Sequence, residues 1–332
     1  MMSRLRPAVV SAFVLQCVVV TMNANLGAQT APPTGEQLLM LQTPTGGIAG
    51  SLIVPKSSTP IPLAVIIPGS GPTDRNGNSV LIPGANNSLK LLAEGLAAHG
   101  IASLRYDKRG VGASAASSVN EFDMRFTNSA DDAAAWVDRI RRDPRFSTIT
   151  IVGHSEGSLV GMLAAPKSAT DAFVSISGAG RSADKIIREQ LAKQLPPDLL
   201  RYTNRALDTL LVGHRVDSVP PPLMALLRPS AQGYLISWIK IDPQAEIAKL
   251  QMPVLIVQGT LDAQVPESDA KLLAAAQPKA KLIVVDGMNH VLKKTATDQQ
   301  SQAKSYSDPT LPVPPELIDG ISAFIKTVPR RK

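Results

Sequence analysis

The chain has 332 residues, enough for one large α/β domain that carries an insertion, and 44% of them are hydrophobic, which is ordinary for a globular protein. Its 34 Lys and Arg outnumber 27 Asp and Glu to give a net charge of +7, but the excess is scattered and aromatic residues make up only 4%. A nucleic-acid-binding surface, which typically shows a basic stripe with aromatic side chains, is therefore disfavoured.

The N-terminus has the features of an export signal. Arg4 and Arg6 precede an apolar run over residues 8–20, and Ala28 offers a small residue for cleavage. The run is shorter than the about 20 apolar residues that span a bilayer, so a retained membrane anchor is the weaker alternative. We expect a signal peptide over residues 1–28 and a secreted or periplasmic mature chain without a stable membrane span.

The chain has a single cysteine, Cys17, which lies inside the expected signal peptide. Lipidation of Cys17 is disfavoured because the bulky Gln16 precedes it. The mature chain would therefore contain no disulfide, no thiolate nucleophile and no cysteine-bound metal.

Predicted strands and helices alternate along most of the remaining chain. A hairpin is predicted first, from strands over residues 36–42 and 47–54. Further strands are predicted from short apolar runs at residues 62–67, 101–106, 148–152, 172–177, 254–257 and 281–285. Helices are predicted from apolar spacing at residues 88–98, 129–142, 155–165, 268–276 and 315–326. This alternation predicts a mostly parallel sheet with helices on both faces.

The alternation stops between residues 181 and 248. This segment contains helical pieces, a Pro220-Pro221-Pro222 break and Trp238, but no convincing buried strand. It is too long for a plain connection. We therefore predict a helical cap over residues 181–248, inserted between the two parts of one core, 29–180 and 249–332.

The pentapeptide GHSEG stands between the predicted strand 148–152 and the predicted helix that follows it. Its Ser155 would occupy a tight strand-to-helix turn, which is typical of a nucleophile elbow. Gly153 and Gly157 leave room for that turn, and the helix N-terminus brings its dipole and free amides close to a developing negative charge. Ser155 is the predicted nucleophile, with a glycine-flanked helix start as the alternative.

A serine hydroxyl needs a base, and the chain has four histidines. His99 is expected to end a helix, His154 to turn its ring away from the serine, and His214 to lie in the cap. His290 follows the last predicted strand in a polar loop, where the carboxyl ends of parallel strands collect a site. His290 is therefore the predicted general base.

The predicted acid is Asp262, in the loop after the strand 254–257. The chain order Ser155, Asp262, His290 is the order expected of a triad on such a sheet. Asp262 would orient the imidazole without taking its proton. Its rival is Asp286, only four residues before His290, where an aspartate more often forms a turn.

The developing oxyanion requires two backbone donors. One is expected to be the amide of Glu156, directly after the nucleophile. The other is expected in the glycine-containing segment 68–72, where Ser70 is the first choice and Gly71 the alternative. A simple turn is the competing interpretation of this segment.

At these positions the chain resembles the α/β-hydrolase superfamily, especially its exported esterase-like members. Besides the pentapeptide, three segments carry the likeness: PGSGPTDRNGN at 68–78 is similar to the oxyanion loop, RYDKRGVGAS at 105–114 to the segment after the next strand, and GTLDAQVP at 259–266 to the acid loop. The likeness covers about residues 60–180 and 250–330. One departure is Pro68-Gly69 where many relatives have His-Gly, at a residue that does not donate the oxyanion amide.

The resemblance implies an α/β-hydrolase fold and hydrolysis of a small-molecule ester through an acyl-enzyme, without metal or organic cofactor. Asp107 and Arg109 are expected to be structural. The apolar cap residues are expected either to cover an acyl pocket or to pack among themselves; they are Leu199, Leu200, Leu210, Leu211, Met224, Leu226 and Leu227. A peptidase, lactonase or thioesterase on the same triad is the alternative, followed by a non-catalytic binding protein. No oligomeric state is predicted.

Overall fold

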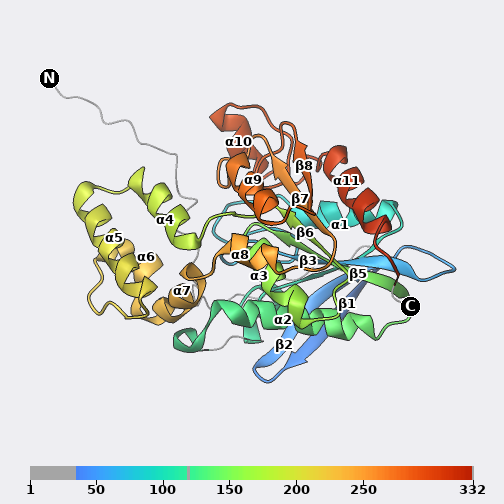
Figure 1. Ribbon diagram of the computed structural model, residues 1–332, viewed down its shortest axis with the longest axis horizontal. Coiled ribbons are helices and arrows are strands. Elements are labelled where there is room, and N and C mark those ends of the chain that lie inside the picture. Colours follow the sequence, from blue (N-terminus) through green and yellow to red (C-terminus); the bar gives the residue numbers. More distant parts are fainter. Residues whose placement is uncertain (1–34, 118–119, 331–332) are drawn as a thin grey trace.

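The computed structural model describes residues 35–117 and 120–330, so the expected signal peptide, residues 1–28, lies outside the described residues. An eight-stranded sheet in the order β1-β2-β4-β3-β5-β6-β7-β8 forms its centre (Figure 1). The strands are β1 (Glu36–Thr43), β2 (Gly46–Ile53), β3 (Ile61–Ile67), β4 (Ala102–Tyr106), β5 (Phe146–His154), β6 (Ala172–Ile176), β7 (Val254–Gly259) and β8 (Lys281–Val285). β2 pairs antiparallel with both of its neighbours, β1 and β4, and the remaining neighbouring strands pair in parallel. The predicted mostly parallel sheet is confirmed.

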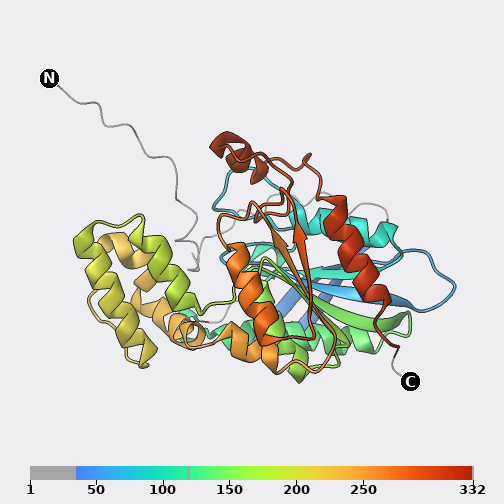
Figure 2. The same ribbon diagram turned by 45° about the horizontal axis from the view of Figure 1, so that its top comes forward.

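Helices cover both faces of this sheet because its central strands are apolar on both sides. One face packs against α1 (Ser88–Ala98) and α11 (Pro315–Lys326), and the other against α2 (Phe126–Arg141), α3 (Glu156–Ala164) and α9 (Glu267–Ala276). In Figure 2 the red α11 and the orange α9 lie on either side of the sheet. No helix within residues 35–117 and 120–330 is long and apolar enough to cross a bilayer.

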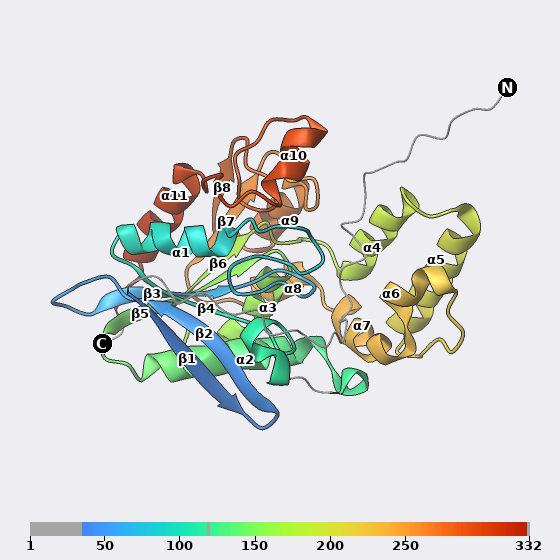
Figure 3. The same cartoon turned by 180° about the vertical axis from the view of Figure 1, so that it is seen from behind.

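The chain between β6 and β7 forms helices, as the prediction of an inserted cap requires. They are α4 (Ala183–Ala192), α5 (Pro197–Leu211), α6 (Met224–Leu227), α7 (Gln232–Ile239) and α8 (Pro243–Ala248). The first four share an apolar core of their own, and they extend from one side of the sheet in Figures 1 and 3. Trp238 packs against both this core and the core of the sheet domain, so it joins the two.

One helix was not predicted. The segment α10 (Gln299–Ser305) reads QQSQAKS and has no apolar periodicity. Its N-terminus is capped by Asp298, whose carboxylate accepts a hydrogen bond of 2.8 Å from the Ser301 amide. A polar sequence of this kind forms a helix because of its N-terminal cap and its contacts with the rest of the fold, such as the hydrogen bond from Asn289 to the Ser305 hydroxyl.

A buried ion pair ties the hairpin to the sheet. Arg105 on β4 has a fully buried side chain, and its guanidinium donates to the Glu36 carboxylate over 2.6 Å and to the side-chain oxygen of Asn76. The Glu36 side chain is only 9% exposed. Because the Arg105 charge has no access to water, these partners must offset the free-energy cost of burying it.

Replacing Glu36 with alanine is therefore expected to lower the free energy of unfolding by about 3–5 kcal/mol, since it leaves a buried guanidinium without its carboxylate. Urea denaturation of the two proteins measures the difference. The matched control is Glu94→Ala, which removes an exposed helical pair with Lys90 and should change stability by about 0.5 kcal/mol or less. Equal effects of the two substitutions would contradict the role given to the buried pair.

Candidate active site

Ser155 lies in a sharp turn between β5 and α3. Its φ of 56° and ψ of −122° are seldom adopted by residues other than glycine. The turn can close because glycine has no Cβ at these two positions. A Cβ added to Gly153 would lie 2.2 Å from the Gly157 carbonyl oxygen, and one added to Gly157 would lie 2.5 Å from the Ile67 carbonyl oxygen. Both glycines are therefore required by close backbone packing, as expected for a nucleophile elbow.

The structure brings the three predicted triad residues together. His290 Nε2 lies 3.0 Å from Ser155 Oγ, and His290 Nδ1 lies 2.9 and 3.0 Å from the two carboxylate oxygens of Asp262. A hydrogen bond on Nδ1 leaves Nε2 as the nitrogen that faces the serine hydroxyl. The arrangement can therefore take a proton from Ser155 and hold the resulting positive charge.

The Asp262 carboxylate is buried but well supplied with donors. Its Oδ1 accepts hydrogen bonds of 2.9 Å from the amides of Gln264 and Val265, and its Oδ2 accepts one of 3.2 Å from Gln258 Nε2. Burial by itself would raise the pKa of Asp262, but the neighbouring His290 and the hydrogen bond from the Val265 amide hold it below its ordinary value. Asp262 is thus kept ionised beside the imidazole.

Gln258 is a functional-site residue that the sequence analysis missed. It occupies a fully buried position on β7 and donates to the Val265 carbonyl over 2.8 Å as well as to Asp262. The signal was present, because a glutamine in the otherwise apolar run of β7 needs a polar partner.

The rival acid and two other histidines lie elsewhere. Asp286 is exposed and accepts a hydrogen bond of 3.2 Å from Thr260 Oγ1. His99 ends α1 and bonds to the Gly95 carbonyl and to Asp319, as expected of a helix terminus. His214 is exposed in the insertion.

The Ser155 hydroxyl faces His290, whereas the ring of His154 packs beside His290. The His154 ring centroid lies 5.0 Å from that of His290, and His154 Nε2 donates a hydrogen bond of 2.8 Å to the His290 carbonyl. Burial, followed by the neighbouring His290, lowers the pKa of His154 to about 4. His154 is therefore a neutral donor that holds the backbone of the loop carrying His290.

This lowered pKa makes stability depend on pH. Between the ordinary pKa of 6.5 and the folded value of about 4, unfolded chains bind a proton at His154 that folded chains do not, so stability falls as the pH falls. The difference corresponds to about 3 kcal/mol of unfolding free energy, fully lost near pH 4. Urea denaturation at pH 7, 5 and 4 should show a shallower decline for His154→Gln than for the unsubstituted chain. The control His214→Gln should follow the unsubstituted chain, and identical pH profiles for all three would contradict the assignment.

Ser70 and Glu156, the two predicted oxyanion donors, border the same pocket as Ser155. The loop that carries Ser70 runs close to the nucleophile, since a Cβ added to Gly69 would lie 3.2 Å from Ser155 Cβ. Asp107 anchors this loop, as its carboxylate accepts a hydrogen bond of 2.8 Å from the Arg75 amide and one of 2.9 Å from the Ala113 amide. The structural role expected of Asp107 agrees with these contacts.

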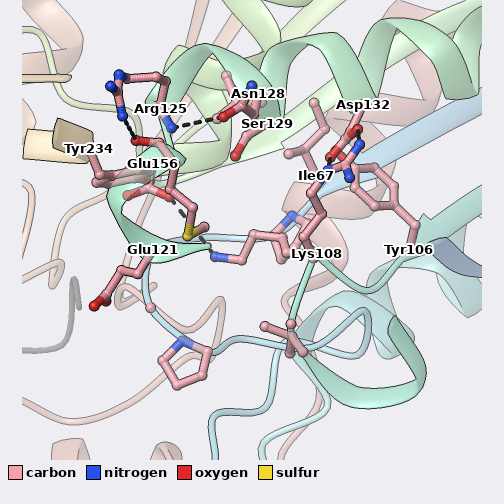
Figure 4. Close-up of a pocket in the computed structure, with 18 of the residues that line it drawn as sticks. Ile67, Tyr106, Lys108, Glu121, Arg125, Asn128, Ser129, Asp132, Glu156 and Tyr234 are labelled. Carbon is pink, nitrogen blue, oxygen red and sulfur yellow. Dashed lines mark hydrogen bonds and ion pairs between the residues drawn. The ribbon is translucent and has the colours of Figure 1, made fainter. Parts of the chain in front are cut away.

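Two pockets meet at Glu156. One, with about 780 Å³ of empty space including its mouth, is lined by Ser155 and Ser70 and by Ile186, Ile187 and Trp238 of the insertion. The other, with about 1030 Å³ of empty space including its mouth, is also lined by Glu156 and is shown in Figure 4. Its lining includes Lys108, Arg125, Asp132, Glu156 and Tyr234.

The apolar cap residues named from the sequence line neither of these two pockets. Leu210, Leu226 and Leu227 are buried in the insertion's own core, whereas Met224 is 41% exposed. The insertion instead covers the nucleophile with α4 and α7. Of the two alternatives expected for these residues, packing among the helices of the insertion is the one that the buried leucines follow.

Comparisons with known proteins agree with this architecture. A family model described as the alpha/beta hydrolase family matches residues 80–292. Esterase EstD of Thermotoga maritima is 27% identical over 250 residues, which are 74% of this chain but only 58% of that protein's length. Est1E from Butyrivibrio proteoclasticus with bound ferulic acid has a TM-score of 0.54 at 18% identity, covering 87% of this chain and 100% of that one. DcsB in complex with a substrate analogue has a TM-score of 0.58 at 20% identity, covering 88% of this chain and 99% of that one.

Proposed function

Because the chain belongs to the alpha/beta hydrolase family, we propose that it is a serine hydrolase that cleaves small to medium carboxylic esters through an acyl-enzyme. The observation that carries the proposal is the continuous hydrogen-bonded series Ser155–His290–Asp262, with distances of 3.0 and 2.9 Å. This series supports Ser155 as the nucleophile, His290 as the base and Asp262 as the orienting acid. The curated esterase relative gives the substrate class further support.

The mechanism follows from this geometry. Ser155 Oγ attacks the ester carbonyl carbon while His290 Nε2 takes the hydroxyl proton, and the carbonyl oxygen becomes an oxyanion that the Ser70 and Glu156 amides stabilise. His290 then gives its proton to the leaving alcohol, which leaves the acyl group on Ser155. Water repeats the two steps, with His290 again as base, and releases the acid. Asp262 stabilises the imidazolium without taking its proton.

The pocket beside Ser155 supports small and medium substrates. Leu159, Ile186 and Ile187 supply an apolar wall for an acyl chain. Ser155 lines the same pocket, together with Ser70 and Glu156, the residues of the two proposed amide donors. Such a pocket holds an ester by its apolar part and leaves the carbonyl at the nucleophile.

A series of p-nitrophenyl esters from acetate to palmitate tests this function. We expect kcat/KM to be highest for short or medium acyl chains and to fall for palmitate. Parallel assays with a thioester, a lactone and a peptide p-nitroanilide test the other acyl transfers on the same triad, and a higher kcat/KM for one of them would replace the ester assignment. No turnover of any substrate, together with no labelling by a fluorophosphonate, would contradict the enzyme assignment.

We also propose that the chain is exported and that residues 1–28 are removed, on the basis of the positively charged and apolar composition of this segment. N-terminal sequencing of protein recovered from the periplasm or the medium tests this. A mature chain that begins at Gln29 is expected, and a chain retained in the cytoplasm with its N-terminus intact would contradict the proposal.

A further inference from the structure

Lys108 lies directly beside the candidate oxyanion donors, although the mechanism above assigns it no role. It follows β4 by two residues, and its side chain is only 16% exposed. Its ammonium donates a hydrogen bond to the carbonyl oxygen of Gly69 and lies 4.0 Å from the Glu156 carboxylate. Figure 4 shows Lys108 extending towards Glu156 across the pocket.

The Gly69 carbonyl and the Ser70 amide belong to one peptide unit. This unit is planar and trans, so its C=O and N–H point in opposite directions. A donor that holds the Gly69 oxygen on one side therefore fixes where the Ser70 N–H points on the other. It also polarises the peptide, which strengthens the N–H as a donor. The next peptide is held separately, because Thr73 Oγ1 donates to the Ser70 carbonyl over 2.7 Å.

The second contact of Lys108 reaches the other donor. Glu156 supplies its backbone amide to the candidate oxyanion site, while its side chain is 6% exposed and faces the Lys108 ammonium. One side chain thus contacts the peptide unit that contains the Ser70 amide, through its Gly69 carbonyl, and also faces the side chain of Glu156. Asp107, by contrast, anchors the same loop farther along the chain, at Arg75.

We propose that Lys108 is a positioning residue that holds the Gly69–Ser70 peptide and Glu156 in the geometry that binds the oxyanion. The proposal rests on the ester-hydrolase function above. A residue that acts on the oxyanion donors affects the transition state more than the bound ester, so its loss should appear in kcat and leave KM nearly unchanged.

Lys108→Met removes the ammonium and keeps most of the apolar stem. We expect kcat for a p-nitrophenyl ester to fall about 10- to 100-fold, which is below the effect of deleting one oxyanion donor, with KM changed by less than about threefold. Affinity for a trifluoromethyl ketone, which forms an oxyanion on Ser155, should fall by the same factor. Affinity for the corresponding methyl ketone should stay as it was. The control Lys167→Met removes an exposed lysine paired with Asp131 and should leave all four quantities unchanged.

A double variant separates positioning from simple charge balance. If Lys108 only neutralises the buried Glu156 carboxylate, then Lys108→Met combined with Glu156→Gln should restore kcat, since no buried charge is left without a partner. If Lys108 orients the Gly69–Ser70 peptide, the double variant should stay impaired, because the Gly69 carbonyl still lacks its donor. Restored kcat in the double variant would overturn the proposal. The comparison also remains valid if Lys108→Met alone folds poorly, provided that thermal unfolding shows the double variant to be folded.

Chemical rescue gives an independent test. The chain has one cysteine, Cys17, so Lys108→Cys on a Cys17→Ser background contains a single thiol. Alkylation with 2-bromoethylamine restores an ammonium at nearly the reach of lysine and should recover kcat, whereas a neutral alkylating reagent should not. Recovery with both reagents or with neither would overturn the proposal. An unsubstituted chain without activity would overturn the proposed function, whereas an active one with an unimpaired Lys108→Met would overturn only the role of Lys108.

Discussion

Replacing Ser155 with alanine is expected to lower kcat for a p-nitrophenyl ester by about 10⁶-fold, because it removes the atom that forms the acyl-enzyme. His290 and the amide donors would remain in place, so KM should change little. Steady-state and burst kinetics on protein from an esterase-deficient host measure both values. No burst is expected, since no acyl group can accumulate without Ser155 Oγ.

The matched control for this substitution is Ser158→Ala. Ser158 lies one turn further along α3, and its hydroxyl bonds to Ser175 Oγ over 2.6 Å. This variant should retain activity, because the hydroxyl that faces His290 Nε2 is that of Ser155, whereas the Ser158 hydroxyl bonds to Ser175. Residual turnover by Ser155→Ala within tenfold of the unsubstituted chain would contradict the assignment of the nucleophile.

Asp262→Asn is expected to lower kcat by about 10⁴-fold while preserving the fold. The asparagine amide would donate to His290 Nδ1, so that Nε2 carries the proton and cannot accept one from Ser155. The burial of Asp262 strengthens this effect, because the carboxylate, held by the amides of Gln264 and Val265, has little access to solvent. Single-turnover kinetics should place the loss in the acylation step.

The control for this second prediction is Asp286→Asn. Asp286 is exposed and contacts Thr260, so its substitution should leave kcat close to that of the unsubstituted chain. A severe loss with Asp286→Asn and a mild one with Asp262→Asn would reverse the assignment of the acid. Similar losses with both would indicate that the loop, and not one carboxylate, orients His290.

The sheet and the triad geometry could be predicted from the sequence because their signals are local. Apolar runs between glycine-rich turns predict the strands. The glycines at 153 and 157 predict the tight turn at Ser155, and the structure shows that a side chain at either position would clash with the backbone. Chain order then selects Asp262 and His290, since loops at the carboxyl ends of neighbouring parallel strands meet at one edge of the sheet. The structure places both within hydrogen-bonding distance of their expected partners.

Apart from Gln258, whose partners are close in sequence, the missed features of the site depend on contacts between distant segments. The direction of the His154 ring is set by a carbonyl 136 residues away, and no local pattern encodes that pairing. The leucines of the insertion were uncertain because an amphipathic helix shows which face is apolar but not what covers it. Lys108 is part of a recognisable segment, yet its contact with Gly69 appears only when two loops are packed together.

The central claim is that Ser155 carries the acyl group during turnover. Labelling the active chain with a fluorophosphonate, followed by intact-mass measurement and tandem mass spectrometry of peptides, tests this most directly. We expect one adduct per chain, on Ser155, with loss of esterase activity in proportion to labelling and no adduct on Ser155→Ala. An active chain that is inhibited by an adduct on another residue, or that remains unlabelled at full inhibition, would contradict it.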